Sequence, residues 1–127
     1  SLPNQQSEMA RFIGQTDYGY GGISTAFLSD FSNDGLPDLA IGEYAARTNP
    51  DDPATAYGAV RIFLGVPSGT QMLSSAPMTL WGDGGAFGYH LAAVGDADGD
   101  GLTDLLVGAY TADDGAGITR LFSGGVP

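Results

Sequence analysis

Residues 96–110 read DADGDGLTDLLVGAY, and residues 30–44 read DFSNDGLPDLAIGEY. Eight of these fifteen positions are identical at a constant offset of 66 residues. A second pair follows, because residues 58–65 (GAVRIFLG) match residues 117–124 (GITRLFSG) at four of eight positions, now at an offset of 59. Two matches in the same order indicate an internal repeat. The chain therefore contains two copies of one unit, and the change of offset places seven extra residues of the first copy in a loop within residues 46–57.

Short apolar segments recur in the same order in both copies. The composition, with 21 glycines and 7 prolines among 127 residues, favours short strands joined by turns. Segments such as 39–41 and 105–107 are too short for helices and are bounded by Gly and Asp, so we interpret them as buried strands. The expected strands, in chain order, are residues 9–14, 24–29, 39–41, 59–64, 78–82, 90–95, 105–107 and 118–123.

The order of these segments predicts the fold. Three consecutive strands and a fourth contributed from the neighbouring repeat are typical of β-propeller blades. We therefore expect an all-β fold of four-stranded antiparallel blades of a β-propeller, with two blades per chain. Residues 1–22 are the expected N-terminal outer strand and lead-in, residues 23–77 the first blade and residues 78–127 the second. The N-terminal strand is expected to have no partner within the chain and to pair with the last blade of a closed ring.

The acidic stretches of the two copies, residues 30–38 (the first acidic loop) and 96–104 (the second acidic loop), predict metal binding. Carboxylates at alternate positions of a tight turn can converge on one cation, and the Gly at position 6 lets the backbone reverse. Six to eight hard oxygen ligands favour calcium over magnesium. We predict two calcium ions per chain, bound by Asp30, Ser32, Asp34, the carbonyl of Leu36 and Asp38, and by Asp96, Asp98, Asp100, the carbonyl of Leu102 and Asp104.

The acidic loops allow two other interpretations. An EF-hand shares the D-x-D-x-D-G spacing but requires Glu at position 12, where this chain has Ile41 and Val107. The acidic residues could also line solvated turns without a metal. The presence of two copies, each followed by Asp at position 9, favours the metal.

The second copy resembles the FG-GAP repeat of integrin α-subunit propellers. The resemblance rests on the second acidic loop, preceded by Phe87-Gly88 and followed by Gly108-Ala109-Tyr110. The first copy matches more loosely, with Gly21-Gly22 in place of Phe-Gly and Gly42-Glu43-Tyr44 as its closing triplet. The resemblance implies calcium in the hairpin between the first two strands of each blade. It also implies extracellular or cell-surface use, with structural ions and with ligand contacts made by other loops.

The charge balance restricts the partners. Four basic residues face fifteen acidic ones, which gives a net charge of −11 and argues against nucleic acid and anionic membranes. No apolar run is long enough for membrane insertion. Cysteine is absent, so disulfides and thiol chemistry are excluded. The only histidine, His90, is expected to be a structural residue of a buried strand, and we predict no catalytic residues.

Two blades cannot close a propeller, which takes four to eight. The expected partners are therefore other copies of this chain, arranged as a ring of blades, or the remaining blades of a longer chain. We expect an extracellular adhesion or protein-interaction scaffold. The alternatives are a calcium-dependent carbohydrate-binding lectin and a non-catalytic blade fragment of a larger secreted protein.

Overall fold

The computed structural model describes residues 7–15 and 18–125. Within these residues the fold is all-β, as predicted, with two short 3-10 helices, η1 (Pro53–Thr55) and η2 (Leu73–Ser75), and no α-helix. The strands are β1 (Ala10–Ile13), β2 (Gly21–Leu28), β3 (Asp38–Glu43), β4 (Ala59–Phe63), β5 (Gly69–Met72), β6 (Met78–Trp81), β7 (His90–Ala93), β8 (Leu105–Ala109) and β9 (Ile118–Phe122). None of the described segments forms a helix of the length and apolarity that crossing a membrane requires.

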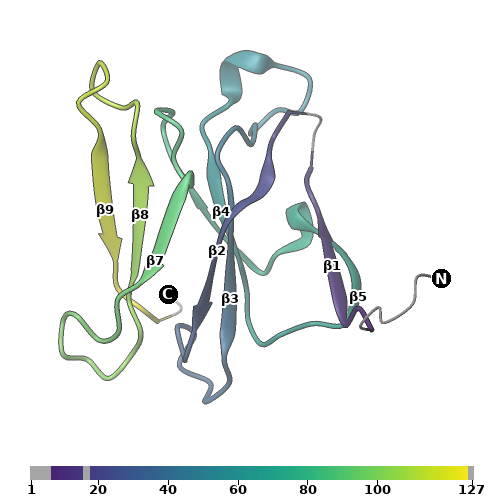
Figure 1. Cartoon of the computed structure of the whole chain (residues 1–127), viewed down its shortest axis with the longest axis vertical. Coiled ribbons are helices and arrows are strands. Elements are labelled where there is room, and N and C mark those ends of the chain that lie inside the picture. The colour runs from purple at the N-terminus through teal and green to yellow at the C-terminus, as the bar shows by residue number, and fades with distance from the viewer. Residues whose placement is uncertain (1–6, 16–17, 126–127) are drawn as a thin grey trace.

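Two antiparallel sheets follow the two sequence repeats (Figure 1). The first sheet has the strand order β2-β3-β4-β6, that is, three consecutive strands and a fourth. The second sheet has the order β7-β8-β9 within the described residues. Every strand predicted from the repeats is present, with ends that differ by a few residues.

The expectation that the N-terminal strand lacks a partner within the chain is wrong. β1 pairs in parallel with β5, a strand that the sequence analysis missed, and the two form a small sheet. Apolar packing explains this arrangement, because the ring of Phe12 lies 5.0 Å from that of Phe63. Leu73 of η2 is buried in the same cluster. The small sheet and η2 thus cover one face of the first sheet.

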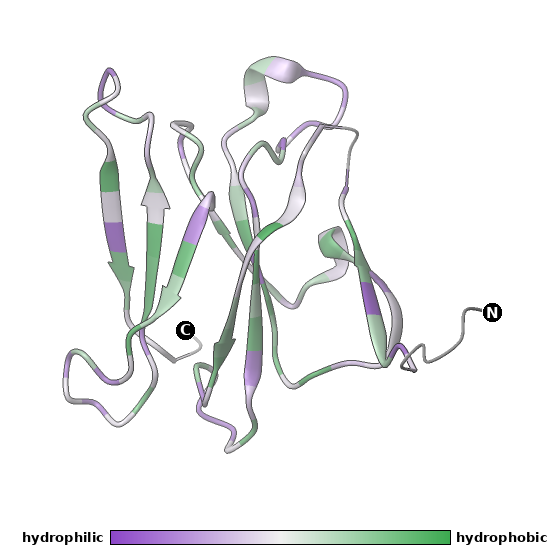
Figure 2. Cartoon of the chain, viewed as in Figure 1, coloured by the Kyte–Doolittle hydropathy of each residue, from purple (hydrophilic) through white to green (hydrophobic). Residues whose placement is uncertain are grey.

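The main core lies between the two large sheets. Alternate residues of β3 and β4 point toward the second sheet, and alternate residues of β8 point back, as the period of two in a strand requires. Figure 2 shows the hydrophobic stretches along these strands and more polar loops at their ends. The buried cluster comprises Leu28, Phe31, Ala40, Val60, Ile62, Phe87, Leu105, Val107 and Ala109.

The prediction that His90 lies in a buried strand is wrong. β7 is largely exposed, and so is the His90 side chain. The physical reason is that the first sheet covers only one face of the second sheet, and the other face meets solvent. Leu121 of β9 lies on this open face and is therefore 56% exposed.

The recurring arginines, Arg61 and Arg120, occupy equivalent positions with different partners. Arg61 is buried, and its Nε donates to Glu43 Oε1 at 2.9 Å on the neighbouring strand. Its Nη2 donates to Gln15, which directly follows β1 and Gly14. Arg120 donates instead to Asp83, the residue that follows β6 in the same way. Each arginine therefore meets one carboxylate, which comes from β3 in the first repeat and from the segment after β6 in the second.

Candidate metal centres

The two acidic loops are the hairpin tips of their sheets. The first joins β2 to β3 and the second joins β7 to β8. Figure 1 shows both tips at the same end of the molecule, opposite the long loop that carries η1. The two sequence repeats thus adopt equivalent hairpins in the structure.

The aspartate at position 1 folds each loop around its own carboxylate. Asp30 Oδ1 accepts hydrogen bonds from the backbone N–H of Asn33 (2.8 Å) and Asp34 (3.1 Å). Asp30 Oδ2 accepts from Gly35 at 3.0 Å. Asp96 accepts from the three equivalent residues of the second loop. The first carboxylate therefore sets the shape of the turn as well as its charge.

Backbone conformation explains the glycine at position 6. Gly35 and Gly101 have φ of 79° and 87°, in the left-handed region that favours glycine, as predicted. Position 4 also lies in this region, with φ of 67° at Asn33 and 81° at Gly99. Asn tolerates this conformation better than other residues with a side chain, so both loops can adopt the same turn.

The aspartate at position 9 is buried and plays a role that sequence analysis did not foresee. Asp104 Oδ2 accepts from the backbone N–H of Ala97 (2.7 Å) and Asp98 (3.2 Å). Its Oδ1 accepts from Gly124 at 2.8 Å, which lies just past β9. Asp38 makes the equivalent three bonds in the first loop. These carboxylates join each loop to the segment that follows the third strand, and Oδ1, which accepts a single bond, still has a lone pair for a cation.

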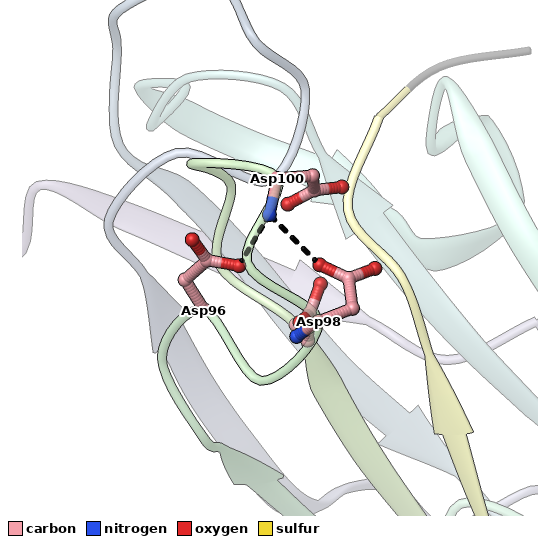
Figure 3. A group of neighbouring side chains, drawn as sticks. Asp96, Asp98 and Asp100 are labelled. Atoms are coloured by element: carbon pink, nitrogen blue, oxygen red, sulfur yellow. Dashed lines mark hydrogen bonds between the residues drawn. The ribbon is translucent and has the colours of Figure 1, made fainter.

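The predicted carboxylates converge. Asp30, Asp34 and Asp38 place one oxygen each within 4.8 Å of one another, and the four aspartates of the second loop do the same. Figure 3 shows Asp96, Asp98 and Asp100 gathered around the turn, with the backbone N–H of Asp100 bonded to the other two. The carbonyls of Leu36 and Leu102 remain predicted ligands.

Ser32, at position 3 of the first loop, has a buried hydroxyl. It is the one buried side-chain oxygen or nitrogen of the described residues that has no hydrogen-bond partner. An unpaired buried hydroxyl is unfavourable, and a cation bound to its oxygen would offset part of that cost. The substitution of Ser for Asp at this position is thus compatible with an oxygen ligand.

Ser123 adds a contact to the second loop that the first lacks. Its hydroxyl donates to Asp98 Oδ2 at 2.5 Å and lies 3.2 Å from Asp100 Oδ2. The hydrogen bond from Ser123 lowers the pKa of Asp98 below its ordinary value. Asp98 therefore stays ionised at neutral pH and available to a cation.

The two loops touch each other. The backbone N–H of Thr103 in the second loop donates to the carbonyl of Asp30 in the first at 3.3 Å, and Gly125 N–H donates to the carbonyl of Phe31. The hydroxyls of Ser29 and Thr103 are also hydrogen-bonded. Three hydrogen bonds thus join the first loop and Ser29 to the second loop and the segment that follows β9.

Sequence analysis missed a tyrosine cluster. Tyr20 stacks on Tyr44 with 5.2 Å between ring centroids, Tyr44 meets Tyr89 at 5.1 Å, and Tyr89 meets Tyr110 at 4.6 Å. Tyr18 extends the series through Tyr20. These residues precede β2 and β7 or follow β3 and β8, so they gather at the strand ends opposite the acidic loops. Only the recurrence of Tyr44 and Tyr110 in the repeat signalled this in the sequence.

Comparison with known proteins agrees with the geometry. The family model described as "FG-GAP-like repeat" matches residues 30–107, which include both acidic loops. Integrin alpha-5 of Xenopus laevis is 37% identical over 106 residues, covering 79% of this chain and 9% of the integrin. Integrin alpha-PS2 of Drosophila melanogaster is 36% identical over 110 residues (83% of this chain, 8% of the integrin). Human integrin alpha-IIb is 36% identical over 101 residues, which cover 76% of this chain and 9% of the integrin.

The chain thus spans less than a tenth of the length of these curated relatives. The matched region nonetheless contains the complete pattern of both loops and the strands β3 to β7 between them. Since the family model covers more than half of the chain, this protein belongs to the FG-GAP-like repeat family and carries repeats of the integrin α type.

Proposed function

We propose that this chain is a calcium-binding, integrin-α-like propeller module with two blades and two structural calcium ions, which serves outside the cell as a scaffold for adhesion or protein interaction. The observation that carries the proposal is the convergence of carboxylates in both acidic loops, with ligand oxygens within 4.8 Å of one another. The propeller is completed by other copies of the chain or by further blades of a longer one. The module binds and does not catalyse.

Electrostatics supports a cation in each loop. Two unit charges 4.8 Å apart repel by about 0.9 kcal/mol in water and by several times more near a protein surface. Four aspartates in the second loop and three in the first concentrate this repulsion at two points. All candidate ligands are hard oxygens, and their geometry is that of a flexible turn, which suits calcium better than magnesium.

The ions would stabilise the fold. Each loop is bonded to the end of its own third strand through Asp38 or Asp104, and the loops are bonded to each other through Asp30 and Thr103. A cation that fixes one loop therefore also fixes the hairpin and the contact between the two sheets. The chain has no cysteine, so the ions would supply the cross-linking that disulfides provide elsewhere.

The tyrosine cluster is the surface on which we place a protein partner. Tyr18 is 75% exposed and Tyr110 54% exposed, although their rings contact neighbouring tyrosines of the cluster. Exposed tyrosines that are held by their neighbours are enriched at protein interfaces, since they offer large contact area at low entropic cost. Desolvation, and after it the neighbouring tyrosines, raises the pKa of Tyr44, so its phenol remains a hydrogen-bond donor.

Calcium titration of metal-free protein tests the proposal. We expect two binding events per chain and a rise in melting temperature. Asp34→Ala and Asp100→Ala, each in a different loop, should each remove one event. Asp51→Asn is the matched control, because Asp51 is an exposed acid of the loop around η1 and should leave both events intact. Absence of binding heat and of any thermal shift in the unmodified chain would refute calcium binding.

A further inference from the structure

The tyrosine cluster is a continuous series of ring contacts that crosses from the first sheet to the second. The distances between ring centroids are 5.2 Å for Tyr20 and Tyr44, 5.1 Å for Tyr44 and Tyr89, and 4.6 Å for Tyr89 and Tyr110. Tyr44 directly follows β3, and Tyr89 directly precedes β7. The middle contact is therefore the one that joins the two sheets.

The contact between Tyr44 and Tyr89 is fixed by the backbone beneath it. A Cβ built on Gly42, two residues before Tyr44, would lie 2.0 Å from the carbonyl oxygen of Gly88, the residue before Tyr89. A hydrogen bond from β7 to β2 holds the two sheets together in the same region. The backbone therefore holds the two phenols next to each other, which favours a reaction between them over a reaction between separate molecules.

The outer members of the cluster are open to solvent, and the inner ones are half-buried. Tyr18, Tyr20 and Tyr110 are between 51% and 75% exposed. Tyr44 and Tyr89 are half-buried between them. A dissolved oxidant can therefore reach the outer rings first. Because neighbouring phenols lose an electron at nearly the same cost, the electron vacancy can move along the ring contacts to the inner pair.

The other oxidisable side chains compete poorly with this cluster. The chain has no cysteine. The guanidinium of Arg61 lies 4.9 Å from the ring centroid of Trp81, and this positive charge makes removal of an electron from the indole less favourable. Tyr57 is 39% exposed but has no aromatic contact within the described residues. Oxidation of Tyr57 therefore leaves it without a tyrosine to couple with, whereas each member of the cluster has one beside it.

We propose that the tyrosine cluster is a site of oxidative cross-linking, at which a carbon–carbon bond between the rings of Tyr44 and Tyr89 joins the two sheets. The co-reactant is a one-electron oxidant, such as a peroxidase supplied with hydrogen peroxide. Each phenol loses one electron and one proton, and the two radicals couple at ring carbons adjacent to the carbon that bears the oxygen. Each coupled carbon then passes its hydrogen to that oxygen, which restores both aromatic rings, while the peroxide takes up two electrons and two protons and leaves as two waters.

This bond lies at the end of the molecule opposite the acidic loops. It restricts the unfolded chain as a disulfide does, in a protein that has no cysteine. The proposal depends neither on calcium nor on the protein partner proposed for the same surface.

Tryptic mapping of the oxidised chain tests the inference, because the four arginines separate the tyrosines. Cleavage after arginine gives peptide 12–47 with Tyr18, Tyr20 and Tyr44, peptide 48–61 with Tyr57, and peptide 62–120 with Tyr89 and Tyr110. After treatment of the folded protein with peroxidase and hydrogen peroxide, we expect peptides 12–47 and 62–120 to be joined with the loss of two hydrogens. Fragment spectra should place the bond at Tyr44 and Tyr89. An equal mixture of isotope-labelled and unlabelled chains identifies bonds within one chain, because such a pair of peptides carries a single isotope.

Single substitutions identify the reacting rings. Tyr44→Phe and Tyr89→Phe keep each ring and remove the reacting phenol, so each should reduce the yield of joined peptides to background. Tyr57→Phe is the matched control and should leave that yield unchanged. In concentrated urea the selectivity should be lost, and peptide 48–61 should also become cross-linked. The inference is overturned if the folded chain gives no joined peptides, if they join only between chains, or if Tyr89→Phe leaves their yield unchanged.

Discussion

The two aspartates at positions 5 and 9 of the second loop should affect stability in opposite directions when calcium is absent. Asp104 is fully buried and accepts three backbone hydrogen bonds, whereas Asp100 is exposed and accepts one backbone bond, from Leu102, and a longer one from Ser123. Both belong to the same group of four carboxylates. The comparison therefore separates a carboxylate that holds the loop together from one whose main role is to bind the cation.

The magnitudes follow from these contacts. Hydrogen bonds to a charged acceptor contribute about 1.5 kcal/mol each at the low end, so Asp104→Ala loses roughly 4.5 kcal/mol. Either substitution also relieves repulsion by three carboxylates, which totals about 2 kcal/mol after allowance for salt. Asp104→Ala should therefore destabilise the calcium-free chain by about 2.5 kcal/mol. Asp100→Ala loses only about 1 kcal/mol of exposed hydrogen bonds and should stabilise it by about 1 kcal/mol.

Urea unfolding in the presence of a chelator measures both effects, and the same experiment in calcium provides the contrast. In calcium both variants should be less stable than the unmodified chain, because each has lost a ligand of the second ion. If Asp104→Ala and Asp100→Ala shift the calcium-free midpoint in the same direction, the assignment of a structural role to position 9 is incorrect.

Three further predictions concern the scaffold around the loops. Glu43→Ala leaves the buried Arg61 without a carboxylate partner and should cost about 3–5 kcal/mol in urea unfolding. Glu8→Ala, which breaks the exposed pair with Arg11, should cost far less, and equal costs would contradict the buried pair. Ser123→Ala removes the hydrogen bond that lowers the pKa of Asp98, so that pKa should rise in an NMR titration of calcium-free protein. Because the folded-state pKa of Asp98 is lowered, the contribution of Asp98 to stability is present above the ordinary Asp pKa of about 3.9 and is lost as the pH falls through the folded-state pKa. An unchanged pKa in Ser123→Ala would show that the hydrogen bond from Ser123 does not cause the lowering. Thr103→Pro places in the second loop the residue that the first loop has at Pro37 and removes the N–H donated to Asp30. Both calcium sites should persist with a stability loss of about 1 kcal/mol, and calcium at one loop should raise the calcium affinity of the other less than in the unmodified chain. Unchanged coupling between the two sites would show that this bond does not link the loops.

The sequence predicted the parts of the fold that repeat. The strands around the acidic loops were found because the same residues recur at a fixed offset, and the glycines at position 6 follow from the turn that converging carboxylates require. β5 was missed because GTQM has neither alternating polarity nor a counterpart in the second copy. Its pairing with β1 depends on packing near Phe12 and Phe63, which no local pattern reveals.

The sequence predicted which residues form the candidate site, but only part of what each of them does. Convergence of the carboxylates could be expected from their spacing. The bonds that Asp38 accepts from Gly65, and Asp104 from Gly124, could not, because they link each loop to the segment that follows the third strand. The tyrosine cluster was missed because it depends on long-range contacts: the pairing of β2 with β3 brings Tyr20 to Tyr44, and the packing of the two sheets brings Tyr44 to Tyr89. Exposure of β7 follows from which faces are covered, and that depends on neighbours the repeat pattern does not specify.

Native mass spectrometry of the chain in calcium-containing buffer tests the central claim most directly, because it counts ions and chains together. The account predicts two calcium ions per chain in the unmodified protein and one in Asp100→Ala. Magnesium at the same concentration should be retained poorly. A chain that carries no calcium at millimolar concentration, or that keeps two ions after Asp100→Ala, would contradict the assignment of the acidic loops as calcium sites.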